Sequence, residues 1–277
     1  MYHDLVAEGD EDASGFPGRD AALYKISVTA FSQHLDAISE SLYSHPADPA
    51  PPAPPAPPAR PAPPAHAAHP TLPLLTFDDG GVSAMVAADL LERRGWIGHF
   101  FITTNYIGRR GFLLPDEIRS LAARGHVIGA HSCSHPLRMA RCPWEQLVDE
   151  WSRSCSVLSG IIGGRVDEAS VPGGDFAPQV AQAAARAGIV RLFTSEPTGR
   201  IRTAYGLTLA GRFTVQRWTS ASTAAAMAQG DWLPCARQTL IWNAKKMTKR
   251  LGGARYLQVR RLLLGQRKEV QWGDFNG

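Results

Sequence analysis

The sequence has few charged residues and no long apolar run. Charged side chains make up 19% of its 277 residues, and 29 Lys and Arg against 25 Asp and Glu leave a formal net charge of +4. So mild a positive charge does not require a nucleic-acid partner, and we expect none. No stretch approaches the roughly 18 to 20 apolar residues of a membrane-spanning helix. A hydrophobic content of 44% nevertheless excludes wholesale disorder.

Cysteine is also sparse. The sequence has four cysteines and no CxxC pair, so we expect free thiols rather than a disulfide framework. The acidic N-terminus lacks the basic region and apolar region of a secretory signal peptide. These absences predict a cytoplasmic protein with one globular domain over residues 1–277.

Proline is concentrated in one segment. Residues 46–73 hold 13 of the 21 prolines, interspersed with alanines. Proline lacks a backbone N–H and fixes φ, so this segment cannot form a helix or a central strand. We expect a disordered Pro/Ala-rich insert with polyproline II character. A ligand for the aromatic groove of another protein is the alternative.

Short apolar runs alternate with helical patterns along most of the chain. Strands are expected at 72–77, 99–104, 126–130, 166–171, 189–194 and 212–218, and helices at 21–43, 82–95, 114–125, 144–161, 178–187 and 221–229. This alternation is typical of a parallel α/β sheet or barrel. Six or seven strand–helix units favour a (β/α) barrel, in which chemistry takes place at the carboxyl ends of the strands.

Two of these strand ends carry residues suited to metal chemistry. The strand at 72–77 runs into Asp78 and Asp79, and the strand at 126–130 runs into His131 and His135. Adjacent carboxylates at a buried edge need a compensating cation or proton, although a helix N-cap is an alternative role for one of them. Two imidazoles and one carboxylate can bind one cation and leave positions open for water.

These motifs resemble those of a known family. TFDDG (76–80) and HSCSHP (131–136) are similar to the first two motifs of the polysaccharide deacetylases, also called carbohydrate esterase family 4 or the NodB-homology domain. Further similar segments follow in the family's order: YHDLV (2–6), GHFFITTNYIG (98–108), GHVIGAH (125–131), SVPGGDF (170–176) and AGIVRLFTSEP (187–197). The resemblance implies a distorted (β/α)7 barrel and a hydrolase acting on carbon–nitrogen bonds other than peptide bonds.

The resemblance also implies roles for individual residues. The ligands of one divalent metal, usually zinc, would be Asp79, His131 and His135. Asp78 would deprotonate metal-bound water, which attacks the acetyl group of an N-acetylated sugar, polysaccharide or lipid-linked glycan. The N–H of Gly173, after the motif-three Pro172, would help to hold the oxyanion.

The sequence departs from the family pattern at two positions. Ser170 stands where the family usually has an Arg that orients the catalytic Asp, so the tuning of Asp78 must come from elsewhere or be weaker. The family's late His, which protonates the leaving amine, is absent, because no His follows His135. His3 is a candidate for that acid because its strand should end at the same rim. The alternative is that His3 only forms a hydrogen bond at the barrel mouth.

Other candidates lie towards the C-terminus. Arg217 and Trp218 end the expected strand at 212–218 and could line the sugar site, although Trp218 also suits packing. Residues 245–268 contain nine Lys and Arg and no acid, with leucines interleaved. This basic amphipathic segment fits a peripheral contact with an anionic membrane surface. The alternative is a terminal helix packed on the barrel.

Two other functions compete with metal-dependent deacetylation. A degenerate family member would bind metal and glycan without turnover, as the missing Arg and late His suggest. A non-haem iron oxygenase would use the same two-His, one-carboxylate ligand set. The absence of an HxD pair on one strand argues against the oxygenase.

Overall fold

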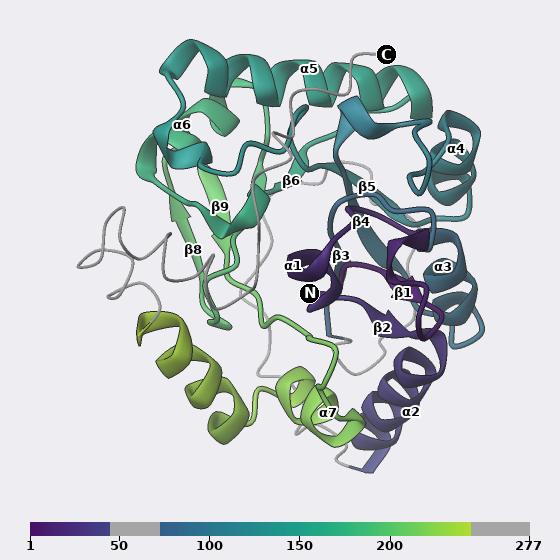
Figure 1. Cartoon of the computed structure of the whole chain (residues 1–277). Coiled ribbons are helices and arrows are strands. Elements are labelled where there is room, and N and C mark those ends of the chain that lie inside the picture. Colours follow the sequence, from purple (N-terminus) through teal and green to yellow (C-terminus); the bar gives the residue numbers. More distant parts are fainter. Residues whose placement is uncertain (45–72, 245–277) are drawn as a thin grey trace, which may run out of the picture.

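A curled sheet of seven strands forms the centre of the structure (Figure 1). The computed structural model describes residues 1–44 and 73–244. The strand order is β3-β4-β5-β6-β7-β9-β8, and only β8 is antiparallel to its neighbour. The strands are β3 (Leu75–Phe77), β4 (Gly98–Ile102), β5 (Val127–Ala130), β6 (Glu168–Ser170), β7 (Arg191–Phe193), β8 (Ile201–Ala204) and β9 (Leu207–Ala210). The curled, mainly parallel sheet confirms the expected α/β barrel type of the polysaccharide deacetylases.

Helices cover the outside of this sheet. They are α2 (Val28–Ser44), α3 (Ala84–Glu92), α4 (Pro115–Ala123), α5 (Trp144–Ile162), α6 (Pro178–Arg186) and α7 (Ala221–Gln229). The short α1 (Arg19–Ala22) lies over the middle of the view in Figure 1, and residues 232–244 form a further helix. In α5, the fully buried Leu147, Trp151 and Leu158 recur at helical spacing and face the core. The helix ends at Gly163, which takes the left-handed conformation (φ 66°) that glycine adopts without strain.

The N-terminal segment joins the sheet less extensively than expected. Tyr2 alone bridges β3, through hydrogen bonds from its N–H to the Thr76 carbonyl (2.7 Å) and from the Asp78 N–H to its own carbonyl (3.1 Å). The next residues form β1 (Leu5–Val6), which pairs in parallel with β2 (Ile26–Ser27). Because β2 takes residues 26 and 27, the long helix begins at Val28 rather than near residue 21.

The C-terminal half differs from the sequence expectations in two places, and the strand expected at 212–218 was wrong. Residues 212–218 form no strand, because they leave β9 and cross to the N-terminal segment, where single hydrogen bonds hold them, such as that from the Val215 N–H to the Met1 carbonyl (2.9 Å). The β8–β9 hairpin was not predicted. Its two-residue turn, Tyr205-Gly206, has positive φ at both positions (56° and 82°), which is typical of a type I′ hairpin turn.

Side chains inside the curled sheet form layers, because alternate residues of each strand point inward. At the amino ends of the strands, Glu168 pairs with His99 (2.7 Å) and with Arg191 (2.7 Å). The apolar cluster of Phe101, Phe193 and Ala210 comes next along the strands. The layer at the carboxyl ends is polar and holds the candidate site. The barrel interior therefore supports the site with packed side chains from below.

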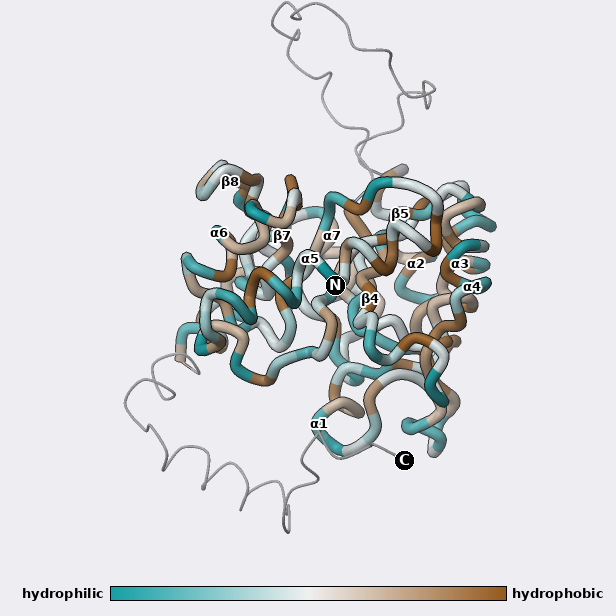
Figure 2. Tube along the Cα trace, turned by 90° about the horizontal axis from the view of Figure 1, so that it is seen from above, coloured by the Kyte–Doolittle hydropathy of each residue, from teal (hydrophilic) through white to brown (hydrophobic). Residues whose placement is uncertain are grey.

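Two regions of interest lie outside the described residues: nearly all of the insert at 46–73 and the whole basic segment at 245–268. Viewed from above, the described chain shows polar and apolar residues mixed along the outer helices (Figure 2). Among the described helices, none combines the length and apolar character needed to cross a bilayer.

Candidate metal centre

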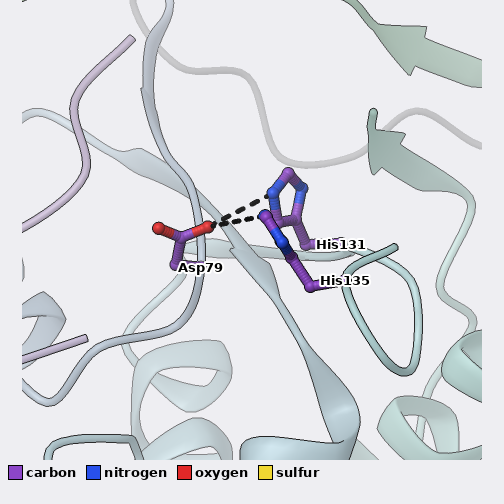
Figure 3. A group of neighbouring side chains, drawn as sticks. All are labelled: Asp79, His131 and His135. Carbon is purple, nitrogen blue, oxygen red and sulfur yellow. Dashed lines mark ion pairs between the residues drawn. The ribbon is translucent and has the colours of Figure 1, made fainter. Parts of the chain in front are cut away.

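Three side chains converge at the carboxyl ends of β3 and β5 (Figure 3). The Nε2 atoms of His131 and His135 lie 3.3 Å and 3.5 Å from Asp79 Oδ1. The three ligand atoms all fall within 4.8 Å of one another. Asp79 and His135 both have positive φ (77° and 56°), an uncommon conformation for residues other than glycine. Such backbone strain is often found at functional sites.

The protonation states of this group suit a cation. Burial would raise the pKa of Asp79, but the hydrogen bond from His131 and the charges of His3 and His135 hold it below its usual value. Burial lowers the pKa of His135 to about 4, although Asp79 opposes the shift. At neutral pH the group therefore offers an ionised carboxylate and an uncharged imidazole, which are the forms that bind metals.

The donor spacing also fits one metal ion. Two nitrogen or oxygen ligands held about 2.0–2.1 Å from a tetrahedral zinc ion lie about 3.3 Å apart. The two Asp79–His separations match this spacing. His131 Nδ1 contacts the Ser170 carbonyl at 3.0 Å. A proton on Nδ1 would be donated there and would leave the Nε2 lone pair facing the ligand group, as in many zinc sites.

A buried glutamate on α5 holds the turn between the two histidines. Glu150 Oε2 accepts hydrogen bonds from the backbone N–H groups of Cys133 and Ser134, both at 2.8 Å. Its Oε1 accepts the Ser134 hydroxyl. The His135 N–H is in turn donated to the Ser132 hydroxyl at 3.1 Å. The sequence analysis did not identify Glu150, because the helical pattern does not show which of the acidic residues is buried.

Loss of the Glu150 carboxylate is expected to weaken metal binding without unfolding the chain. Glu150→Ala leaves two backbone N–H groups unpaired and frees the turn that sets the spacing of the two histidines. We expect the zinc affinity to be lower by roughly 10- to 100-fold, as measured by competition with a chelating indicator. Glu145→Ala, at an exposed position of the same helix, is the control and should bind zinc normally. Equal affinities of the two variants would contradict this role.

Asp78 is held by a guanidinium that the sequence analysis did not identify. Arg212 donates to both carboxylate oxygens, from Nη1 to Oδ1 at 2.7 Å and from Nη2 to Oδ2 at 2.8 Å. The Ser170 hydroxyl donates to Oδ1 at 3.2 Å. All three side chains are buried. Burial would raise the pKa of Asp78, but the charges of Arg212 and His131 hold it well below its usual range.

Arg212 therefore makes a charged, two-pronged contact with Asp78, whereas Ser170 donates a single hydrogen bond to it. It follows β9 and points inward in the alternation that begins with Thr208 and Ala210. The sequence analysis missed this alternation because it did not predict the β8–β9 hairpin and assigned residues 212–218 to a separate strand. Arg212 also donates to the Thr76 hydroxyl (3.1 Å), so one side chain spans the opening of the sheet between β9 and β3.

His3 lies close to the two aspartates, as the topology predicts. Its charge is among those that lower the pKa values of both Asp78 and Asp79. Its ring lies 4.9 Å from the Tyr24 ring. Its Nδ1 is buried without a hydrogen-bond partner in the described part of the chain. The alternative role for His3, a hydrogen bond at the barrel mouth, is therefore not made by this nitrogen.

The motif-three loop provides an accessible backbone. Pro172 is buried, and Gly173 follows it with φ 58°. A Cβ added at Gly173 would meet no atom of the described chain within 4 Å. A substrate could therefore approach the backbone of this residue. The Asp175 Oδ2 accepts the Ala140 N–H at 3.1 Å, which joins this loop to the segment around Ala140.

The two C-terminal candidates are not brought into the metal group by any described contact. Arg217 pairs with Glu11 at 2.6 Å and lines a small cavity beside β1 and β2. Trp218 is 66% exposed. Cys133, between the two histidines, is buried.

An aromatic wall covers one side of the metal group. The Phe16 ring lies 4.8 Å from the His135 ring and packs edge-on against Tyr106 and Phe112. The loop that carries Phe16 is tied down by Lys25, whose Nζ donates to the carbonyls of residues 11, 14 and 16 at 2.6–2.7 Å. The wall limits the approach of water from this side.

The fold and the site together define a class of protein: a barrel-type α/β protein with a two-His, one-Asp group that could hold a metal ion at the carboxyl ends of its strands. Residues 67–192, which contain this group, match the family model described as polysaccharide deacetylase. Over this segment the chain is similar to the polysaccharide deacetylases, which are hydrolases acting on carbon–nitrogen bonds other than peptide bonds.

Solved structures agree with this fold. The deacetylase PplD of Streptococcus pyogenes, in complex with acetate, is 18% identical with a TM-score of 0.59, over 80% of this chain and 92% of that one. IcaB from Ammonifex degensii is 22% identical with a TM-score of 0.56, over 78% and 94%. A polysaccharide deacetylase from Bacillus cereus is 15% identical with a TM-score of 0.62, over 82% and 67%. No curated protein matches the chain.

Proposed function

We propose that this chain removes acetyl groups, bound as N-acetyl amides, from a sugar, polysaccharide or lipid-linked glycan in a reaction that depends on a divalent metal. The observation that carries the proposal is the convergence of Asp79, His131 and His135 beside an ion-paired Asp78. The family match supports deacetylation of sugars in general. Metal dependence, zinc as the native ion and the N-acetyl linkage are parts of the proposal.

The metal would be held by Asp79, His131 and His135, and when bound it supplies a Lewis acid that polarises the acetyl carbonyl and acidifies water. Asp78 then accepts the proton of the attacking water, since it is ionised at neutral pH and its position is fixed by Arg212. The Gly173 N–H would donate to the oxyanion. His3 would donate the proton that the leaving amine requires.

The structure bears on the rival interpretation, a member that binds glycan without turnover. That interpretation rested on a missing Arg and a missing late His. Arg212 contacts Asp78 in place of the missing Arg, and His3 lies near the same carboxylates. Both observations favour turnover. The proposed iron oxygenase chemistry has no further support from the described contacts.

The proposed activity is tested by acetate release. The full chain is stripped of metal and then reconstituted with zinc, and acetate is measured from N-acetylglucosamine oligomers and from lipid-linked N-acetyl sugars. Release should require the metal, continue without oxygen and fall strongly in His3→Ala. Zinc bound at one per chain without acetate release from any substrate would support the glycan-binding alternative instead. An activity that appears only after reconstitution with iron(II), and only with oxygen, would support the oxygenase.

A further inference from the structure

The last described helix, residues 232–244, is attached to the barrel largely by polar contacts. The Gln238 side chain accepts the Thr214 N–H and donates to the Thr214 carbonyl, both at 2.8 Å. The Thr239 hydroxyl donates to the Pro197 carbonyl at 2.8 Å. The Trp242 ring lies beside Gly174, since a Cβ added there would be 3.0 Å from it. This side of the helix, its inner face, is thus joined to the loop that contains Gly173.

The opposite side of the helix carries Leu233, Leu240 and Ile241 in solvent, and Trp232 is exposed at the start of the helix. The exposed fractions are 77% for Trp232, 64% for Leu233, 72% for Leu240 and 45% for Ile241. We call these four residues, with the exposed Arg237 among them, the outer face. In an ordinary surface helix the apolar residues face the core and the polar residues face water. Here hydrogen-bonding side chains face the barrel, and the apolar residues are uncovered in the described structure, as expected of an interaction surface.

The charge of the surrounding sequence indicates what covers the outer face. Residues 232–268 contain ten Lys and Arg and no acid. Two copies of the outer face packed together would bring the Arg237 of each copy into one apolar interface with no acid of that face to pair with, which opposes a dimer. An anionic lipid surface instead combines an apolar interior for Trp and Leu with phosphates for Arg and Lys.

We propose that the outer face docks on an anionic lipid bilayer, with Trp232, Leu233 and Leu240 inserted at the interface and Arg237 at the level of the phosphates. The inner face of the same helix contacts the motif-three loop through Trp242. Docking therefore places that loop at a fixed position near the bilayer, where sugars attached to lipids are presented. The docking itself does not depend on the proposed deacetylation, so each can fail separately.

Vesicle binding of the full chain tests this proposal. Sedimentation with vesicles of phosphatidylcholine alone is compared with vesicles of equal parts phosphatidylcholine and phosphatidylglycerol. We expect binding to the anionic vesicles only, weakened by salt. The double variant L233S/L240S keeps every cation and should bind at least about tenfold more weakly, because the apolar contribution is lost. The control is Ile201→Ser, a residue that is also 72% exposed but lies on β8, and it should bind like the wild type.

Three results would overturn the proposal. The first is recovery of the wild type in the supernatant with anionic vesicles. The double variant could instead sediment with the vesicles as well as the wild type does, so that charge alone explains binding. Finally, analytical ultracentrifugation without lipid could show a dimer that L233S/L240S abolishes, which would assign the outer face to a second copy. Unchanged circular dichroism and zinc binding establish that each variant is folded.

Discussion

Asp78→Asn is expected to lower kcat for acetate release by about 10²- to 10⁴-fold, the contribution typical of a positioned general base. An amide has nearly the shape of the carboxylate but cannot accept the proton of the attacking water. Asp78 is not in the three-residue ligand group, and its two oxygens are directed at Arg212 and Ser170. Zinc should therefore still bind at one per chain.

Asp79→Asn is the matched comparison, because it makes the same chemical change at the neighbouring residue. It should lose zinc affinity as well as activity, since Asp79 lies within 3.5 Å of both histidine nitrogens. Activity at constant enzyme concentration and zinc stoichiometry are measured for both variants. If Asp78→Asn also failed to bind zinc, Asp78 would be a ligand rather than the base.

Residues near the metal group could be predicted because their signals are local. A strand followed by two acids, and another followed by two histidines four residues apart, place the ligands at one sheet edge from topology alone. The strand and helix boundaries around them agree with the structure to within a few residues, as at α7 (Ala221–Gln229). His3 was placed near the same carboxylates on the same argument.

Arg212 and Glu150 could not be predicted because their contacts are made across the fold. The Arg212–Asp78 pair joins residues 134 positions apart, and recognising it requires knowing that β8 and β9 form a hairpin. Glu150 contacts the histidine turn from a helix whose pattern does not distinguish one acid from another. The family model, which ends at residue 192, does not reach Arg212 either. Only the three-dimensional arrangement shows that a residue distant in sequence compensates for Ser170.

Replacing Arg212 is expected to change both the rate and its pH dependence. Burial raises the pKa of Asp78, and the Arg212 guanidinium lowers it. In Arg212→Met the guanidinium is gone, so the pKa of Asp78 rises. The acid limb of the pH–kcat profile should then move to higher pH, and kcat at neutral pH should fall by roughly 10- to 100-fold as orientation is lost. Arg212→Lys keeps the charge but not the two-pronged contact. Compared with Arg212→Met, its acid limb should lie close to that of the wild type, while its kcat should stay below the wild-type value.

The stability of the folded chain should change in the same experiment. In the wild type, the lowered pKa of Asp78 contributes stability that is present above the unfolded-state pKa and lost as pH falls through the folded-state pKa. In Arg212→Met the carboxyl is buried without its partner, which costs about 3–5 kcal/mol when it is charged. Because the pKa of Asp78 is raised in this variant, the dependence of stability on pH has the opposite sign. The folded variant is more stable at low pH, where Asp78 is protonated, and loses stability as pH rises. Urea unfolding at about pH 5 and about pH 8 should therefore show a larger deficit at the higher pH.

Arg94→Met provides the control, because Arg94 also pairs with an aspartate, Asp36, but on the outer helices. Its pair is partly exposed, so the change should cost about 1 kcal/mol or less and leave the pH–kcat profile in place. A purely structural role for Arg212 would lower stability and leave the acid limb where it is. A shift of that limb in Arg212→Met, with its recovery in Arg212→Lys, is the result that a role through Asp78 requires. In this chain, the Arg212 guanidinium, which follows β9, would then orient the base Asp78. It would do so in place of an Arg at the position that Ser170 occupies, two residues before Pro172.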